Sequence, residues 1–244
     1  MGLEYYLIFF GLLIVCALFS GWASRKVYTT YAAYAEDRVR SNMTGYDTAV
    51  RLLRANGIYD VSIGRVKGRL SDHFHPTKKI VNLSETTFGD NSVAAVAVAA
   101  HEIGHVVQKE RGYIPYKIRT ALVPITNFGA RLALPLVLVG LLLELWLGLA
   151  GDYGYIVAMI GVALYGLSTV FTLVTLPVEL DASRRARKML VEEGIITTED
   201  EEYGAKKVLS AAAMTYLAAL LTSLVYFLRF ALWVIMLFGG RRRD

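Results

Sequence analysis

Two histidines and a glutamate lie within five consecutive residues, His101-Glu102-Ile103-Gly104-His105. This is the H-E-x-x-H pattern. On a helix the two histidines lie one turn apart on the same face, so both imidazoles can reach one zinc ion. Glu102 projects near the same site, where it can accept a proton from the zinc-bound water and pass it to the leaving amine. The pattern predicts peptide-bond hydrolysis by metal-activated water.

The alternative explanation of this pattern is a pair of hydrogen-bonded histidines on a core helix. Chance produces the pattern in fewer than roughly one chain in a hundred of this length, given ordinary residue frequencies. Ser92–Glu110 is rich in Ala and Val, and Asp90, Asn91 and Ser92 are N-cap candidates, so we predict a helix there. Gly104 inside that helix costs about 1 kcal/mol relative to Ala. A close neighbour at that face would explain it.

A catalytic zinc site normally has three protein ligands and a water, so a further ligand is needed. His73 and His75 are one source, and a carboxylate in the segment of Glu179 and Asp181 is the other. Two membrane spans before Glu179 would return the chain to the side of the H-E-x-x-H helix. Pro177 can start a new helix, with Glu179 in its first turn, or kink the old one. The alternative role of Glu179 is that of a charged residue near a helix N-terminus.

Composition indicates an integral membrane protein with a modest polar portion. Of the 244 residues 55% are hydrophobic and 19% charged, and the mean hydropathy is +0.43. Five prolines and one cysteine exclude collagen-like and disulfide-scaffold proteins, and the apolar content excludes a disordered chain. The single cysteine, Cys16, cannot form an intrachain disulfide. The isoelectric point near 9.2 reflects Lys and Arg beside apolar runs, without any nucleic-acid-binding pattern.

The distribution of apolar runs predicts five segments. Residues 1–23 form a transmembrane anchor, 24–120 a cytoplasmic metallopeptidase part carrying the H-E-x-x-H motif, 121–177 a transmembrane hairpin, 178–209 a cytoplasmic helix with the third ligand, and 210–244 a C-terminal transmembrane helix and basic tail. Arg25 and Lys26 place the segment after the anchor in the cytoplasm, and residues 151–154 form an external turn without basic residues. With four spans, the Arg241–Arg243 tail would lie outside, although basic residues next to spans usually lie in the cytoplasm. We expect a multi-pass protein of the cell (inner) membrane whose active site faces the cytoplasm.

Local patterns in residues 24–120 predict a mainly α fold with a small β-sheet. Residues 44–56 form an amphipathic helix with Thr44 as N-cap and Asp47 three residues later. Residues 59–66 and 79–83 are rich in β-branched residues, and we expect two or three short strands. The 79–83 strand is a hypothetical edge for docking an extended substrate.

The order of these motifs resembles a known family. The sequence His101-Glu102-x-x-His105-x-x-Gln108, followed after two apolar runs by Glu-Leu-Asp-Ala-Ser-Arg-Arg-Ala at 179–186, is similar to the membrane-bound neutral zinc metallopeptidases of bacteria (the YugP type). The likeness covers most of the chain. It includes the opening apolar helix, Met-Thr-Gly at 43–45, Arg-Ala-Asn-Gly at 54–57 and Asp-His-x-x-Pro at 72–76.

More distantly the chain resembles the HtpX and prenyl-protein protease group, in which the helix after the spans carries E-x-x-A-D and its Glu is the third ligand. This resemblance implies a gluzincin-like site with one Zn²⁺ per chain, held by His101, His105 and Glu179. The Asp of the pattern falls on Ser183, which is a departure. Asp181 would then be the residue that orients a ligand histidine.

Zinc peptidases of this type often use a basic or hydroxyl group to stabilise the tetrahedral oxyanion. His73, His75, Arg184 and Arg185 are the candidates. Each of them, taken singly, is more simply explained as a solvated or structural residue.

The sequence thus predicts an integral membrane zinc endopeptidase that cleaves membrane proteins or unfolded proteins, and it leaves the oligomeric state open. One alternative is an intramembrane site-2-type protease, in which residues 92–108 would have to cross the membrane. This segment is short for a membrane span. The other is a non-catalytic membrane scaffold or binding protein with a residual metal site. Glu102 argues against the scaffold, because a structural zinc site needs no general base.

Overall fold

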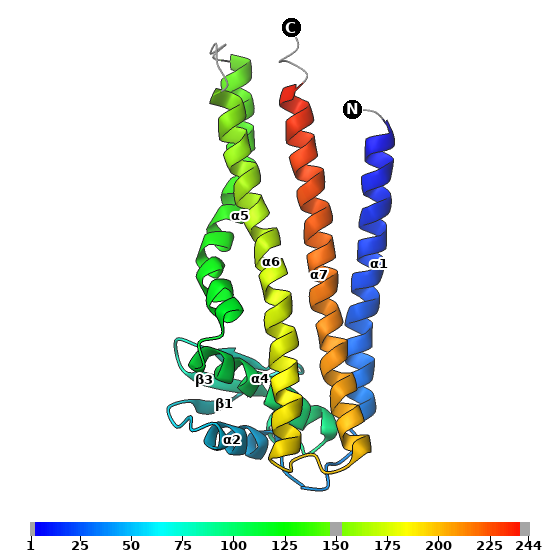
Figure 1. Ribbon diagram of the computed structural model, residues 1–244. Helices are drawn as coiled ribbons and strands as arrows, with labels where there is room; N and C mark the ends of the chain where they lie inside the picture. The colour runs from blue at the N-terminus through cyan, green and yellow to red at the C-terminus, as the bar shows by residue number, and fades with distance from the viewer. Residues whose placement is uncertain (1–2, 147–152, 240–244) are drawn as a thin grey trace. The chain divides into compact units, whose positions relative to one another are not determined.

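The computed structural model describes residues 3–146 and 153–239 (Figure 1). Its elements, in chain order, are α1 (Leu3–Tyr34), α2 (Gly45–Ala55), β1 (Ser62–Val66), β2 (His73–His75), β3 (Ile80–Ser84), α3 (Glu85–Phe88), α4 (Val93–Glu110), α5 (Ile114–Trp146), α6 (Tyr153–Glu192) and α7 (Glu199–Gly239). The described chain is mainly helical with one three-stranded sheet, as the sequence predicts.

Four helices, α1, α5, α6 and α7, are long and apolar enough to cross a membrane. They coincide with the four apolar runs of the sequence. Each is longer than the apolar run it contains, because polar residues extend it at one end. Of the expected external turn, residues 151 and 152 lie outside the described residues, and so does the basic tail at 241–243.

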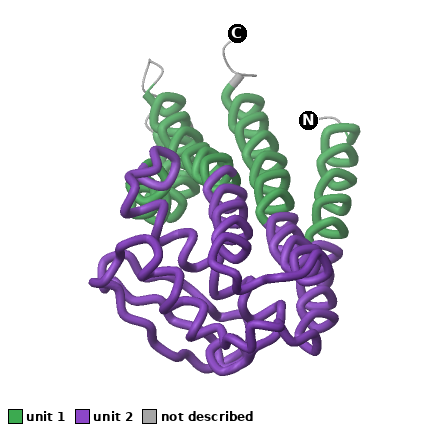
Figure 2. The backbone as a smooth tube through the Cα atoms, turned by 60° about the horizontal axis from the view of Figure 1, so that its bottom comes forward, with its two compact units in different colours: residues 1–20, 118–176, 216–244 green, residues 21–117, 177–215 purple. Residues whose placement is uncertain are grey.

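The chain forms two compact units, coloured separately in Figure 2. The first comprises residues 1–20, 118–176 and 216–244 and contains the apolar parts of the four long helices. The second comprises residues 21–117 and 177–215 and contains α2, the sheet, α3 and α4. The candidate site residues predicted from the sequence all lie in the second unit.

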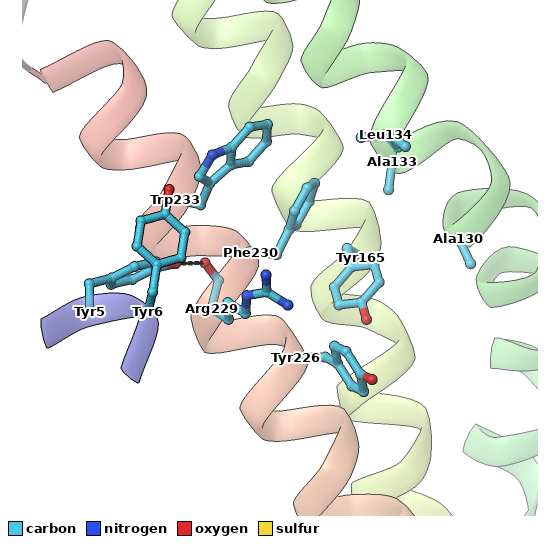
Figure 3. Close-up of a pocket in the computed structure, with 10 residues that line it drawn as sticks. All are labelled: Tyr5, Tyr6, Ala130, Ala133, Leu134, Tyr165, Tyr226, Arg229, Phe230 and Trp233. Carbon is cyan, nitrogen blue, oxygen red and sulfur yellow. Dashed lines mark hydrogen bonds between the residues drawn. The ribbon is translucent and has the colours of Figure 1, made fainter. Parts of the chain in front are cut away.

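The first unit contains a cavity of about 360 Å³ lined mainly by aromatic side chains (Figure 3). Arg229 of α7 also lines it, and the hydroxyl of Tyr5 donates a hydrogen bond to the backbone oxygen of Arg229 at 2.7 Å. This contact joins α1 to α7 within the unit.

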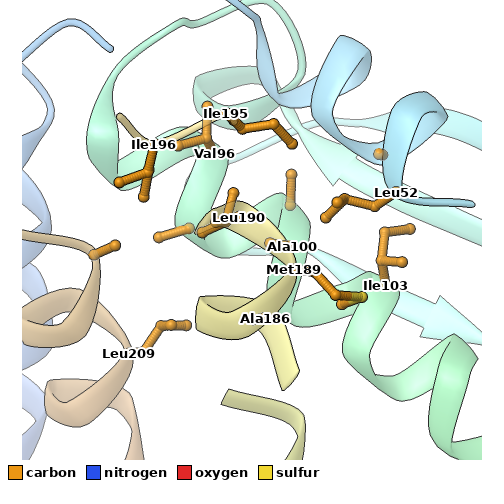
Figure 4. Close-up of a cluster of buried hydrophobic side chains, with 14 of the residues drawn as sticks. Leu52, Val96, Ala100, Ile103, Ala186, Met189, Leu190, Ile195, Ile196 and Leu209 are labelled. Carbon is orange, nitrogen blue, oxygen red and sulfur yellow. The ribbon is translucent and has the colours of Figure 1, made fainter. Parts of the chain in front are cut away.

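The core of the second unit forms around α4 (Figure 4). The small side chains of α4, mostly Ala and Val, let other elements approach closely. Leu52 of α2, Ile103 of α4 and Leu190 of α6 are among its fully buried side chains. Together with α7, these elements pack against α4 on several sides. This packing holds the H-E-x-x-H segment in one position within the second unit.

Short-range signals define the ends of α2 and α4 as predicted. Thr44 caps α2 and forms a full capping box with Asp47, because each side chain accepts a hydrogen bond from the backbone N–H of the other residue. The Ser92 hydroxyl accepts a hydrogen bond from the backbone of Ala95 at the start of α4.

The strand order of the sheet is β1-β3-β2, with β3 parallel to β1 and antiparallel to β2. The expectation that the 79–83 strand offers an edge to a substrate is therefore wrong, since β3 is paired on both sides. Its alternate residues Val81 and Leu83 are fully buried. That burial on one face is typical of a central strand in a small sheet.

Candidate metal centre

Three side chains of the second unit converge on one point. Nε2 of His101 lies 3.2 Å from Oε2 of Glu179, and Nε2 of His105 lies 3.4 Å from the same oxygen. Potential ligand atoms of all three residues lie within 4.8 Å of one another. Ligands about 2.0–2.1 Å from a tetrahedral zinc ion are roughly 3.3 Å apart, so the donor set and its spacing fit zinc. The three side chains are at most 14% exposed.

Two helices position these ligands. α4 carries both histidines one turn apart, with ring centroids 4.7 Å from each other. α6 carries Glu179 and packs closely against α4 at Gly104. A Cβ added to Gly104 would lie 2.6 Å from the carbonyl oxygen of Ala182. The close neighbour that the sequence predicts at Gly104 is therefore the backbone of α6.

α6 runs without interruption through Pro177. The alternative that Pro177 starts a new helix, with Glu179 in its first turn, is wrong. Glu179 lies well inside α6 and is 1% exposed, so it is not an ordinary solvated residue at a helix end. A buried carboxylate requires partners, and a cation held between Oε2 of Glu179 and the Nε2 atoms of the two histidines would be one.

Gln108 fixes the orientation of His105. Its side-chain Nε2 donates hydrogen bonds to the carbonyl oxygen of Val178 at 2.7 Å and to Oδ2 of Asp181 at 2.9 Å. Both partners only accept, so the amide oxygen must face Nδ1 of His105, 3.1 Å away. Nδ1 therefore carries the proton, and the lone pair of Nε2 points to the ligand cluster.

Asp181 and Ser183 support the histidines in different ways. Asp181 contacts neither histidine directly and reaches His105 only through Gln108. Ser183, the departure from the E-x-x-A-D pattern, places its Oγ 3.2 Å from Nδ1 of His101. Neither Gln108 nor Ser183 is predicted from the sequence as a supporting residue. The position of Gln108, three residues after His105 on the same helix face, is the signal that would have found it.

Glu102 is 7% exposed and lies beside the ligands. Burial raises the pKa of its carboxyl to about 7, while the charge of His101 lowers it, and the carboxylates of Asp72 and Glu179 raise it. A carboxyl group with a pKa near 7 can exchange a proton at neutral pH, as a general base must.

The two other histidines lie outside the ligand cluster. His73 of β2 has its Nδ1 2.9 Å from the backbone oxygen of Ser71 and its Nε2 3.1 Å from Nδ2 of Asn82. His73 is still close enough to Glu102 to lower the pKa of that residue. His75 Nδ1 accepts a hydrogen bond from the backbone of Lys78. Among the described residues, the potential metal ligands are thus limited to His101, His105 and Glu179.

The two arginine candidates differ in their surroundings. Nε of Arg185 lies 2.6 Å from Oδ2 of Asp181, and its guanidinium lies 5.6 Å from the ring centre of Tyr113. Arg184 is exposed and lines a groove between α6 and α7. Neither side chain is a member of the ligand cluster.

Comparison with known proteins shows the family to which this chain belongs. Residues 8–235 match the model of a family described as "Putative neutral zinc metallopeptidase". This chain belongs to that family. It is similar to "Putative membrane protease YugP" of Bacillus subtilis (strain 168), with 40% identity over 238 residues that cover 98% of this chain and 100% of the relative. No solved structure matches the chain. Membership of the zinc metallopeptidase family and the resemblance noted from the sequence are in agreement.

Proposed function

We propose that this family member is an integral membrane zinc endopeptidase with one zinc ion per chain. The observation that carries the proposal is the convergence of His101, His105 and Glu179 next to the buried carboxyl of Glu102. The three ligands would hold the ion and leave one position open for water, as in catalytic zinc sites. Bound zinc lowers the pKa of water and polarises the scissile carbonyl.

The chain itself would supply the proton transfers. Glu102 accepts a proton from the attacking water and delivers it to the leaving amine, a role to which a pKa near 7 is suited. Gln108 and Ser183 keep the rings of His105 and His101 in the orientation that the ligands need. His73 is the oxyanion candidate with most support, because it lies close enough to Glu102 to lower the pKa of that carboxyl.

An extended substrate would add to β2 in place of the excluded β3. Among the described strands β2 pairs only with β3, so its other edge is unpaired. The Nζ of Lys109 donates a hydrogen bond to the backbone oxygen of Pro76 at 2.8 Å, which ties the chain after β2 to α4. Strand addition there would bring a substrate backbone beside the ligands.

The substrates that fit best are membrane proteins and unfolded proteins. Glu179 follows directly after the apolar run of α6 that ends at Leu176, so the site belongs near a membrane surface. The basic residues Arg25, Lys26, Arg184 and Arg185 next to apolar runs favour the cytoplasmic side of the inner membrane. An intramembrane site has less support, because α4 packs with a sheet whose edge strands a bilayer would not accommodate.

Zinc content and cleavage test the proposal together. The detergent-purified full chain should contain about one zinc, Glu179→Ala should lose it, and Glu192→Ala at the exposed end of α6 should keep it. Glu102→Gln should retain zinc but no longer cleave unfolded casein. Cleavage by Glu102→Gln would refute the assignment of the base. Zinc without any cleavage by the wild type would favour the scaffold alternative.

A further inference from the structure

A basic groove lies between α6 and α7 in the second unit, and none of the three candidate metal ligands lines it. It has a volume of about 200 Å³. Its lining residues are spaced at i, i+3, i+4 and i+7 on each helix, so each helix contributes one face. They are Leu180, Ser183, Arg184 and Arg187 on α6, and Lys206, Leu209, Ser210 and Ala213 on α7.

The charges of this groove are not balanced. Arg187 lies 3.9 Å from Glu202, and both side chains are substantially exposed. Within the described part of the chain, Arg184 and Lys206 have no ion pair with a carboxylate. Three cations therefore face one acid, and the hydroxyl of Ser210 adds a hydrogen-bond donor, while that of Ser183 already lies 3.2 Å from Nδ1 of His101. Such a set of donors fits a phosphate oxyanion.

The polarity of the groove changes along its length. Along α6 the groove begins at Leu180, just after the apolar run of that helix, and ends at Arg187. Along α7 it begins at Lys206 and ends at Ala213, just before the apolar run of that helix. One end is therefore lined by Leu180 and Ala213, and the other by two cations. A phospholipid has the same gradient, with acyl chains at one end and a charged phosphate at the other.

We propose that this groove binds the phosphate group of an anionic phospholipid from the surrounding bilayer. The basic end holds the phosphate, and the apolar end receives the start of the acyl chains. Basic pockets between membrane helices on the cytoplasmic side commonly bind lipid headgroups in this way. Continuity of both helices with apolar runs favours a lipid over a free phosphate ion.

Native mass spectrometry of the full chain in detergent tests the proposal, with dioleoylphosphatidylglycerol as the probe. Arg184→Gln combined with Lys206→Gln should weaken its binding about tenfold or more. The matched control is Lys188→Gln combined with Lys207→Gln, because it removes the same charge from the same helices outside the groove. The control should change the affinity by less than about twofold. Zinc content of each variant reports whether the second unit is folded.

A second variant keeps the charges and fills the space. Ser210→Phe should also weaken phosphatidylglycerol binding, and this effect does not depend on net charge. Equal weakening in the groove and control pairs would overturn the proposal, as would equal binding of dioleoylphosphatidylcholine. Displacement of the lipid by millimolar inorganic phosphate would assign the groove to a free anion instead. None of these measurements depends on peptidase activity.

Discussion

The amide oxygen of Gln108 lies 3.1 Å from Nδ1 of His105, and the amide nitrogen is held by two acceptors on α6. One side chain of α4 thus links a candidate ligand of α4, His105, to the helix that carries Glu179. The arrangement determines which nitrogen of His105 is protonated, and it couples the histidine to the position of α6.

Replacing Gln108 with Leu removes this hydrogen bond from His105. We expect zinc affinity to fall by about 10- to 100-fold, the usual cost of losing such an outer partner. Competition with a chromophoric chelator measures the change. Asp181→Asn should have a smaller effect, since asparagine can still accept from Gln108. Wild-type affinity in a folded Gln108→Leu variant would contradict the role given to this amide.

Gly104→Ala tests the close approach of α4 and α6. The added methyl would meet the carbonyl oxygen of Ala182 at 2.6 Å, so the helices must separate. Overpacking of this kind costs about 1–3 kcal/mol, against a gain of about 1 kcal/mol in helix propensity. We expect a lower melting temperature and weaker zinc binding, because the ligands lie on both helices. Gly89→Ala is the control, as its Cβ would meet nothing within 4 Å.

The buried carboxyl of Glu102 should make the zinc-free protein sensitive to pH. Its pKa is raised from 4.5 to about 7 chiefly by burial, so between these values the folded state binds a proton that the unfolded state has released. Stability therefore falls as the pH rises from about 4.5 to 7, by about 3 kcal/mol at most. Glu102→Gln removes this contribution. In excess chelator, the melting temperature should differ less between pH 5 and pH 8 for the variant than for the wild type. An equal difference in the two proteins would contradict the prediction.

Local signals in the sequence were enough to predict α2 and α4. The capping box at Thr44 and the N-cap at Ser92 involve residues within one turn of each other, so their contacts are encoded in short spacing. The start of α7 carries a similar local signal, which the sequence-based prediction does not include. There Thr198 and Glu201 exchange side-chain and backbone hydrogen bonds across three residues.

Features that depend on distant partners were not predictable in the same way. The central position of β3 depends on which strands pair, and alternation of side chains does not specify this. Ser183 meets His101 only because of the register between α6 and α4, which the contact at Gly104 sets. Pro177 gives a breaker signal, yet α6 continues through it, and Val178 and Glu179 directly after it are buried.

The order of the ligands along the chain has a consequence during synthesis. His101 and Glu179 are 78 positions apart, and α5 and the apolar part of α6 lie between them. A nascent chain that has already exposed both histidines still lacks the carboxylate until two further apolar helices have left the ribosome. The order of synthesis thus delays assembly of the cluster, and a chain terminated before Glu179 has only two of the three candidate ligands.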